Sequence, residues 1–248
     1  MTETTEIIWP CIRSVGFDGL LVSFGDRLSE PANRAALAFR AAVERAGLSG
    51  IEETSTSLVS CFVRFDPLGT DATDLRAGLS MLLAGQDWYA APMPEGRRLW
   101  HVPTVWGTDL APQLEEAAQA AGLSVDAAVE MLSTTRVRVQ TIGFAPGQPY
   151  LGQLPDCWDI PRQQALTSRI PEGALAVAIR QMVLFSVATP TGWRHVGQTA
   201  IKLFRPDSDM PFVLRPGDEV LFPQATREAY ENMVKSGPDG GAVSEVIR

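Results

Sequence analysis

Three polar residues stand out in the second half of the chain, where most neighbours are apolar or turn-forming. Arg162 and Arg169 each lie beside an Ile-Pro pair, and Gln181 lies between two predicted strands. A guanidinium offers paired donors at fixed geometry, which suits a carboxylate or a carboxyphosphate-like group. A glutamine amide can donate to a carbonyl or a developing oxyanion. We predict Arg162 and Gln181 as catalytic and Arg169 as substrate-binding; alternatively, the arginines pair with acidic neighbours on the surface.

Other kinds of catalytic site find little support in the sequence. Two histidines, His101 and His195, nearly exclude a histidine-dependent triad or a multi-histidine metal site. We interpret His195 as a surface or satisfied core histidine. The cysteines Cys11, Cys61 and Cys157 lie far apart without a CxxC pair, so we expect reduced thiols and no metal site. Walker A and G-x-S-x-G motifs are absent. We expect no cofactor bound by this chain alone, and any ATP to be used by a partner subunit.

The decapeptide 143–152, Gly-Phe-Ala-Pro-Gly-Gln-Pro-Tyr-Leu-Gly, follows the alternating run 136–142. Pro146 and Gly147 suit the central positions of a type II turn. The pattern predicts a rigid loop at a strand end that holds Phe144 and Tyr150 in place; a structural corner of a β-barrel is the alternative. The predicted substrate-binding residues are Gly143, Phe144, Pro146, Gly147, Tyr150, Leu151, Gly152, Arg169 and Trp193.

This decapeptide resembles the GFxPGFPYLGGL signature of the 5-oxoprolinase B-subunit family, also called allophanate hydrolase subunit 1 or the carboxyltransferase small-subunit family. The family includes a sporulation-kinase inhibitor. The resemblance spans nearly the whole chain and is most specific in the second half. It continues through residues 19–25, 63–67, 161–162, 169–173, 190–193, 197–199, 203–204 and 214–218, together with Gln181.

The chain also departs from the family pattern. We interpret these departures as losses from one site. The family's polar or flexible residues give way to apolar or bulky ones, and an apolar group cannot replace a charged donor to a bound anion. The L-H-S element is Met131-Leu-Ser133, T-P-R is Leu166-Thr-Ser168, G-G-Q-T-G-V-Y-P is Ile179-Arg-Gln-Met-Val-Leu-Phe-Ser186, G-R-T-P is Gly197-Gln-Thr-Ala200, and P-x-Y-R-S is Thr56-Ser-Leu-Val-Ser60.

The first half has the pattern of an α+β layer. Strands are predicted at 12–15, 20–24 and 58–65. One helix follows the N-cap Ser29 and ends at Gly47, and a second runs from the N-cap Asp71 to Gly85. This order predicts a small ferredoxin-like domain over residues 1–90, with a linker at 85–98.

The second half is predicted to be a β-barrel with a helical lid, over residues 91–235. The resemblance implies that this barrel is cyclophilin-like, and many short strands separated by Pro/Gly turns agree with it. Two helices are predicted at 109–121 and 125–132. They superficially resemble a DNA-binding helix-turn-helix, but their charges are almost all acidic, so we reject a DNA-binding role. Residues 236–248 are expected to be a flexible tail. Strands are predicted at 99–105, 136–142, 174–179, 183–188, 193–197, 200–204 and 219–222.

Composition narrows the range of partners. The net charge of −8 disfavours nucleic acid, whose binding depends on Lys and Arg. No apolar run approaches the roughly 20 residues of a membrane helix. The acidic, polar N-terminus is unlike a secretory signal, so a cytoplasmic location is expected.

The resemblance implies a B subunit that is inactive alone and pairs with a larger C subunit, as a heterodimer or heterotetramer, and with an A subunit that uses ATP. Together they would open 5-oxoproline to glutamate at a composite site; related fused forms serve urea carboxylation. One alternative is a non-catalytic regulator resembling the histidine-kinase inhibitor. A third is an enzyme subunit whose pocket Met182, Leu184 and Phe185 have reshaped for a more apolar substrate.

Overall fold

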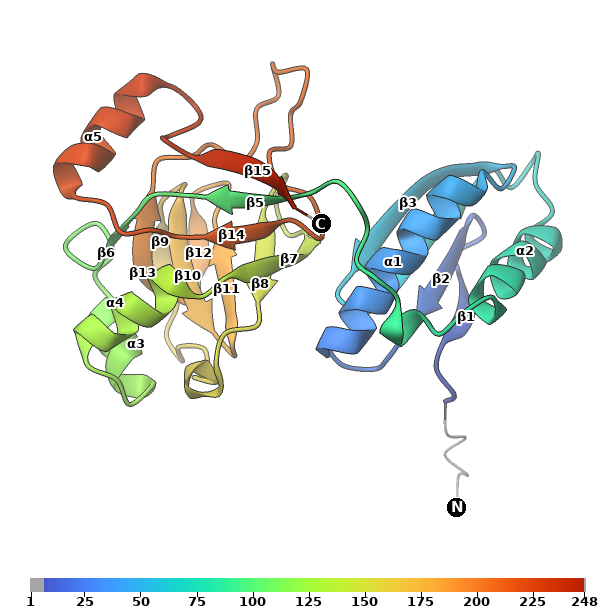
Figure 1. Cartoon of the computed structure of the whole chain (residues 1–248), viewed down its shortest axis with the longest axis horizontal. Helices are drawn as coiled ribbons and strands as arrows, with labels where there is room; N and C mark the ends of the chain where they lie inside the picture. The colour runs from blue at the N-terminus through green and yellow to red at the C-terminus, as the bar shows by residue number, and fades with distance from the viewer. Residues whose placement is uncertain (1–6, 248) are drawn as a thin grey trace. The chain divides into compact units, whose positions relative to one another are not determined.

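The computed structural model describes residues 7–247, which form a mixed α/β structure divided after Pro94 into two units. Each unit has its own sheet (Figure 1), and each has its own apolar core. The predicted fold class is confirmed: a ferredoxin-like unit precedes a unit whose sheet is curled into a half-barrel. The division falls later than residue 90 because Trp88 and Ala91, expected in a linker, belong to the first core.

The first unit is a four-stranded antiparallel sheet in the order β1-β2-β4-β3, with both helices contributing to one core. In a β-α-β-β-α-β ferredoxin-like layer the last strand closes one edge; here the first strand, β1, takes that place. The elements are β1 (Cys11–Val15), β2 (Gly19–Ser23), α1 (Glu30–Ala46), β3 (Ile51–Ser57), β4 (Ser60–Phe65), α2 (Ala72–Ala84) and a 3₁₀ turn, η1 (Trp88–Ala90).

The predicted helix ends of this unit are confirmed. Ser29 Oγ accepts a hydrogen bond from Ala32 N at 3.3 Å, and Asp71 Oδ1 accepts one from Thr73 N at 2.7 Å. Gly47 ends α1 in the left-handed region, with φ at 57°. Cys61 on β4 is fully buried, and this burial raises the pKa of its thiol to about 12. The thiol therefore stays protonated and packs as a small apolar side chain.

The second unit is built on a nine-stranded sheet in the order β15-β5-β14-β7-β8-β11-β10-β13-β6. Helices α3 and α4 pack on one face of it and complete the main core. The elements are β5 (Arg97–His101), β6 (Thr104–Trp106), α3 (Leu114–Ala120), α4 (Val125–Thr134), β7 (Val137–Ile142), β8 (Pro149–Gly152), η2 (Asp156–Trp158), β9 (Thr167–Ile170), β10 (Ala174–Ala178), β11 (Gln181–Leu184), β12 (Thr189–Thr191), β13 (Arg194–Thr199), β14 (Glu219–Leu221), α5 (Arg227–Ser236) and β15 (Val243–Ile247).

Several predicted elements of this unit were wrong. The C-terminal segment, expected to be flexible, forms β15, which pairs antiparallel with β5 from Val243↔His101 to Ile247↔Arg97. The pairing covers an edge of β5 that would otherwise leave backbone groups unpaired. The strand predicted at 99–105 is two strands, β5 and β6, separated at Val102-Pro103. Residues 200–204 form only an isolated bridge, between Phe204 and Phe212.

Asp218 joins β5 to the start of β14. Its carboxylate is almost fully buried and pairs with the Arg98 guanidinium, Nη2 to Oδ2, at 2.6 Å. It also accepts from the backbone N of Arg98 at 3.0 Å, Arg215 N at 3.1 Å and Trp100 Nε1 at 3.3 Å. The Leu214–Asp218 motif therefore has a structural role, because these bonds satisfy a buried charge.

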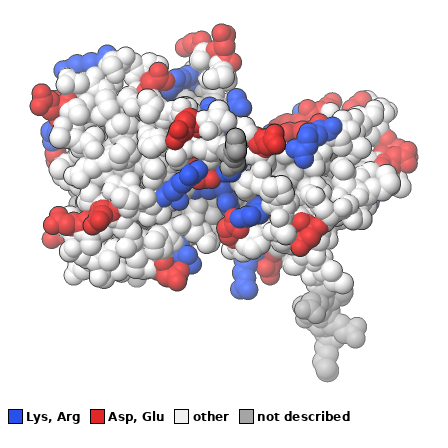
Figure 2. Space-filling view, in the orientation of Figure 1, with Lys and Arg blue, Asp and Glu red and all other residues white. Residues whose placement is uncertain are grey.

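Figure 2 shows how charged side chains are distributed over one face of the protein. On the face that Figure 2 shows, acidic and basic side chains are interspersed over a mostly uncharged surface. No helix among the described residues is long and apolar enough to cross a membrane.

Candidate functional site

The candidate site lies on the face of the second unit's sheet that is opposite α3 and α4. On β11, Met182 and Leu184 point into the main core, so Gln181 and Val183 point to the other face. We call the apolar residues of that face the Trp193 cluster. It consists of Ile170, Ala174, Ala176, Ala178, Val183, Phe185 and Trp193, with Tyr150 packed against it.

The decapeptide is half turn and half strand. Ala145 O accepts from Gln148 N at 3.1 Å and Gly147 has φ at +70°, as the predicted type II turn requires. An added Cβ at Gly147 would lie 3.1 Å from Leu203 O, so only glycine fits closely here. Residues 149–152, predicted as loop, form β8 between β7 and β11. The chain thus makes a sharp corner and returns directly into the sheet.

A β-bulge in β7 directs Gln140 across the neighbouring strand. Gln140 is the extra residue of the bulge between β7 and β8. Its amide lies over the bare Cα of Gly152, where an added Cβ would be 2.8 Å from Gln140 Oε1. Gln181, paired with Gly152 across the strands, donates from Nε2 to the same Oε1 at 2.8 Å. Both glutamines are buried, with exposed fractions of 1% and 7%.

An aromatic pair lies on the same face of the sheet. The rings of Tyr150 and Trp193 meet edge to face with centroids 6.2 Å apart. The guanidinium of Arg162, an exposed residue, lies over the Trp193 ring at 5.1 Å. Gln163 fixes this segment by donating from Nε2 to Trp193 O at 2.9 Å. The arrangement places the Arg162 guanidinium beside an apolar, aromatic surface, which suits a ligand that has both an anionic group and an apolar part.

The remaining predicted site residues lie outside the Trp193 cluster. Leu151 is fully buried in the main core, on the opposite face, because neighbouring strand residues alternate; its prediction as a substrate contact is wrong. Phe144 is 73% exposed, with φ at +72°. Pro146 is exposed at the corner, where Gly143 N donates to Gln148 O at 3.0 Å. Arg169 is exposed on β9.

The departures from the family pattern do not meet at one place. Leu132, at the position of the family's histidine, is fully buried in the main core rather than at the Trp193 cluster. Ile179 and Arg180, at the positions of two family glycines, form the two-residue turn before Gln181. The hypothesis that one site lost all these polar groups is therefore wrong for Leu132, which is a core residue.

Sequence reasoning missed Gln140, because a bulge and a bare glycine on the next strand leave no local signal. It also missed the state of His195, interpreted as a surface or satisfied core histidine. His195 is buried, and its Nε2 has no hydrogen-bond partner among the described residues. Burial lowers the pKa of His195, so the ring is neutral at pH 7.

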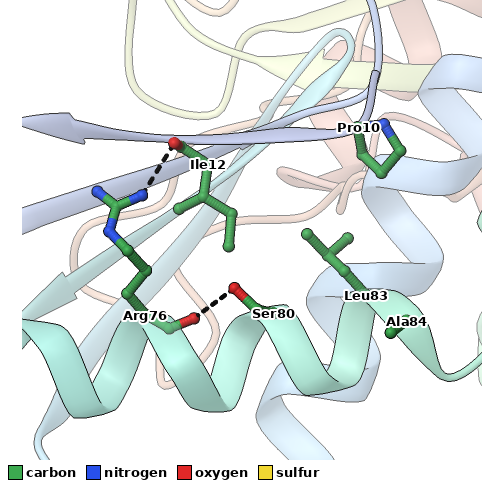
Figure 3. Close-up of a pocket in the computed structure, with 6 residues that line it drawn as sticks. All are labelled: Pro10, Ile12, Arg76, Ser80, Leu83 and Ala84. Atoms are coloured by element: carbon green, nitrogen blue, oxygen red, sulfur yellow. Dashed lines mark hydrogen bonds between the residues drawn. The ribbon is translucent and has the colours of Figure 1, made fainter. Parts of the chain in front are cut away.

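The first unit also contains cavities. One, of about 490 Å³, lies between the start of β1 and α2 (Figure 3). The guanidinium that lines it, from Arg76, already donates to Ile12 O and to Ser14 Oγ, each at 2.9 Å. Arg76 thus ties α2 to β1 and covers the strand's edge. Among the described residues, no group of three His, Cys, Asp or Glu side chains could hold a metal ion.

Comparison with known proteins identifies the chain's relatives. The family model of the carboxyltransferase domain, subdomain C and D, matches residues 10–214. The 5-oxoprolinase B subunit of Bacillus subtilis is 27% identical over 88% of this chain and 94% of its own length. That of Escherichia coli O157:H7 is 39% identical over 52% of this chain and 59% of its own.

Solved structures show the same fold. The crystal structure of TTHA0988 superposes with a TM-score of 0.70 at 29% identity, covering 87% of this chain. The match covers 40% of TTHA0988, so this chain spans less than half of that protein. The urea amidolyase of K. lactis shares the fold alone, with a TM-score of 0.69 at 17% identity over 95% of this chain and 16% of that one.

Proposed function

The chain belongs to the family of carboxyltransferase domains, subdomain C and D, and from this we propose that it is the B-type subunit of a 5-oxoprolinase-type complex. In that complex it would contribute part of the site at which a cyclic amide is hydrolysed. The observation that carries the proposal is the match to a 5-oxoprolinase B subunit over 88% of this chain and 94% of the relative. The Trp193 cluster, with Arg162 and Gln181 beside it, lies within the matched range.

The roles of the residues follow from their surroundings. Arg162 is the cation of the site and is held over Trp193, so it would bind the carboxylate of 5-oxoproline, with Arg169 on β9 as a further cation. Tyr150 and Trp193 would pack against the apolar ring of the substrate. Gln181, buried beside them, would contact the amide.

The site needs a second polypeptide for closure. Phe144, Arg162 and Arg169 are all exposed, and exposed cations hold an anion only weakly against water. We propose that they are covered by a larger C subunit, in a heterodimer or heterotetramer, and that a further A subunit uses ATP. The complex would be cytoplasmic, bind no nucleic acid and no membrane, and this chain alone would be inactive.

Reconstitution tests the proposal. The chain is co-purified with the larger C subunit plus the ATP-using A subunit, and ATP-dependent conversion of 5-oxoproline to glutamate is measured. Arg162→Ala should raise KM about tenfold or more, because a charge-assisted hydrogen bond to the carboxylate is lost. Arg227→Ala, an exposed arginine of α5 paired with Asp109, is the matched control and should leave KM unchanged.

Two results would contradict the proposal. One is an assembled complex that shows no ATP-dependent turnover of 5-oxoproline. The other is a pull-down that returns a histidine kinase and no larger subunit, which would support the regulatory alternative.

A further inference from the structure

The amide of Gln181 is held in one orientation. Its Nε2 donates to Gln140 Oε1 at 2.8 Å, which fixes the nitrogen on the side of β7. Nothing among the described residues donates to Gln181 Oε1, yet this oxygen is not one of the buried polar atoms sealed from solvent. A glutamine held in this way keeps its acceptor oxygen available for a hydrogen bond from another molecule. The oxygen thus offers an acceptor in addition to the donor role that the sequence predicts for Gln181, since the amide nitrogen carries two hydrogens.

Three features of the structure hold Gln140, the acceptor, in place. The bulge in β7 leaves Gln140 without a paired residue on β8, and its amide lies over that neighbouring strand. Gly152 leaves the space that the Gln140 amide fills, since any Cβ there would come within 2.8 Å of Oε1. Gln140 is also 1% exposed, so water has almost no access to the acceptor that holds Gln181. A buried amide pair of this kind is costly to break, because the amide nitrogen of Gln181 would lose its acceptor.

We infer that Gln181 Oε1 accepts a hydrogen bond from the N–H of a lactam or urea-like amide substrate, and that Gln140 is the positioning residue that keeps this oxygen available. The inference rests on the proposed function and adds a rule of selectivity to it. Substrates that carry a hydrogen on the amide nitrogen fit the site. N-alkylated amides and lactones do not, because they leave Gln181 Oε1 without a donor.

Binding of two probes to the reconstituted complex tests the inference. The dissociation constants of 5-oxoproline and N-methyl-5-oxoproline are measured by calorimetry, and their ratio is compared between variants. The wild-type complex should prefer 5-oxoproline. Gln181→Met and Gln140→Met should each reduce that preference about tenfold. Gln140→Glu keeps an acceptor for Gln181 Nε2 and should retain the wild-type preference for 5-oxoproline. The added methyl group has the same bulk in every measurement, so comparing the ratio between variants removes its steric effect on binding.

Controls separate this role from a structural one. Gln198→Met removes another buried glutamine of the same sheet, which donates to Glu172 O at 2.9 Å and Thr199 O at 3.1 Å, and should leave the ratio at the wild-type value. Thermal melting shows which variants are folded. If Gln140→Met does not fold, Gly152→Ala gives the second test, because its Cβ displaces the Gln140 amide and should lower the preference likewise.

The outcomes are distinct. An unchanged ratio in folded Gln181→Met and Gln140→Met variants overturns the inference and leaves the proposed function standing. Failure of the wild-type complex to bind 5-oxoproline overturns both.

Discussion

His195, on β13, is a buried base outside the proposed chemistry. Its exposed fraction is 5%, and desolvation is the main reason that its pKa falls below the ordinary value of 6.5. Hydrogen bonding with Gly197 and Gln198 opposes this only in part. In the unfolded chain the imidazole takes up a proton near pH 6.5, whereas in the folded chain it does so only at lower pH. Neutral His195 therefore stabilises the fold fully above pH 6.5, and this contribution is lost as pH falls.

This predicts a pH-dependent difference between two histidine variants. The melting temperature of the wild-type chain should decline as pH drops below 6.5, and His195→Gln should show a shallower decline because no buried imidazole remains to be protonated. His101→Gln, at the half-exposed histidine of β5, is the control and should follow the wild type. Parallel curves for wild type and His195→Gln would contradict the assignment.

The hairpin of β10 and β11 shows how one element stores strain beside the candidate site. Ala178 pairs with Gln181, so Ile179 and Arg180 alone form the turn, with φ at 45° and 59°. Such two-residue turns favour Asn-Gly, since a β-branched residue is strained at positive φ. The turn is held from outside: Ile179 N donates to Ile160 O at 2.8 Å, and Arg180 Nε donates to Leu154 O at 3.0 Å.

Relief of that strain should stabilise the protein. Ile179→Asn should raise the free energy of unfolding by about 1 kcal/mol, because Asn tolerates the left-handed region and the Ile179 side chain is 43% exposed. Val187→Asn changes another partly exposed β-branched residue that has no positive φ, and it should give no gain. Chemical denaturation measures both. Equal effects of the two substitutions would show that the turn carries no strain.

At the scale of the whole molecule, the two units have separate apolar cores. The first core lies between its sheet and the helices α1 and α2, with Trp88 packed edge to face on Phe39 at 5.0 Å. The second lies between the curled sheet and α3 and α4. A unit that buries its own core can fold alone, because the burial that offsets chain entropy is local to it.

We therefore expect a fragment of residues 1–94 to fold independently. It should show a cooperative thermal transition and dispersed amide resonances. A fragment ending at residue 87 should lose both, since it lacks Trp88, which is 5% exposed in the core. An unfolded 1–94 fragment would mean that the first unit needs the rest of the chain.

Much of the fold was predictable wherever short-range rules apply. Ser29 and Asp71 begin helices because their side chains accept from backbone N–H groups that a helix leaves unpaired. The Pro146-Gly147 turn follows from the φ preferences of two adjacent residues. Leu151 was misassigned because a loop was expected where β8 forms, and in a strand its side chain points to the core, away from Tyr150.

By itself, the sequence determined the helix caps, the turns, the two-unit order and the family, because each depends on neighbouring residues or on a contiguous motif. Only the tertiary structure decided that β15 joins β5, that Leu132 is a core residue, and that the bulged Gln140 lies over Gly152 and holds Gln181. Strand pairing joins residues that are distant in sequence, and the partner of a strand is selected by burial and backbone hydrogen bonding across the whole sheet. No local pattern records that selection.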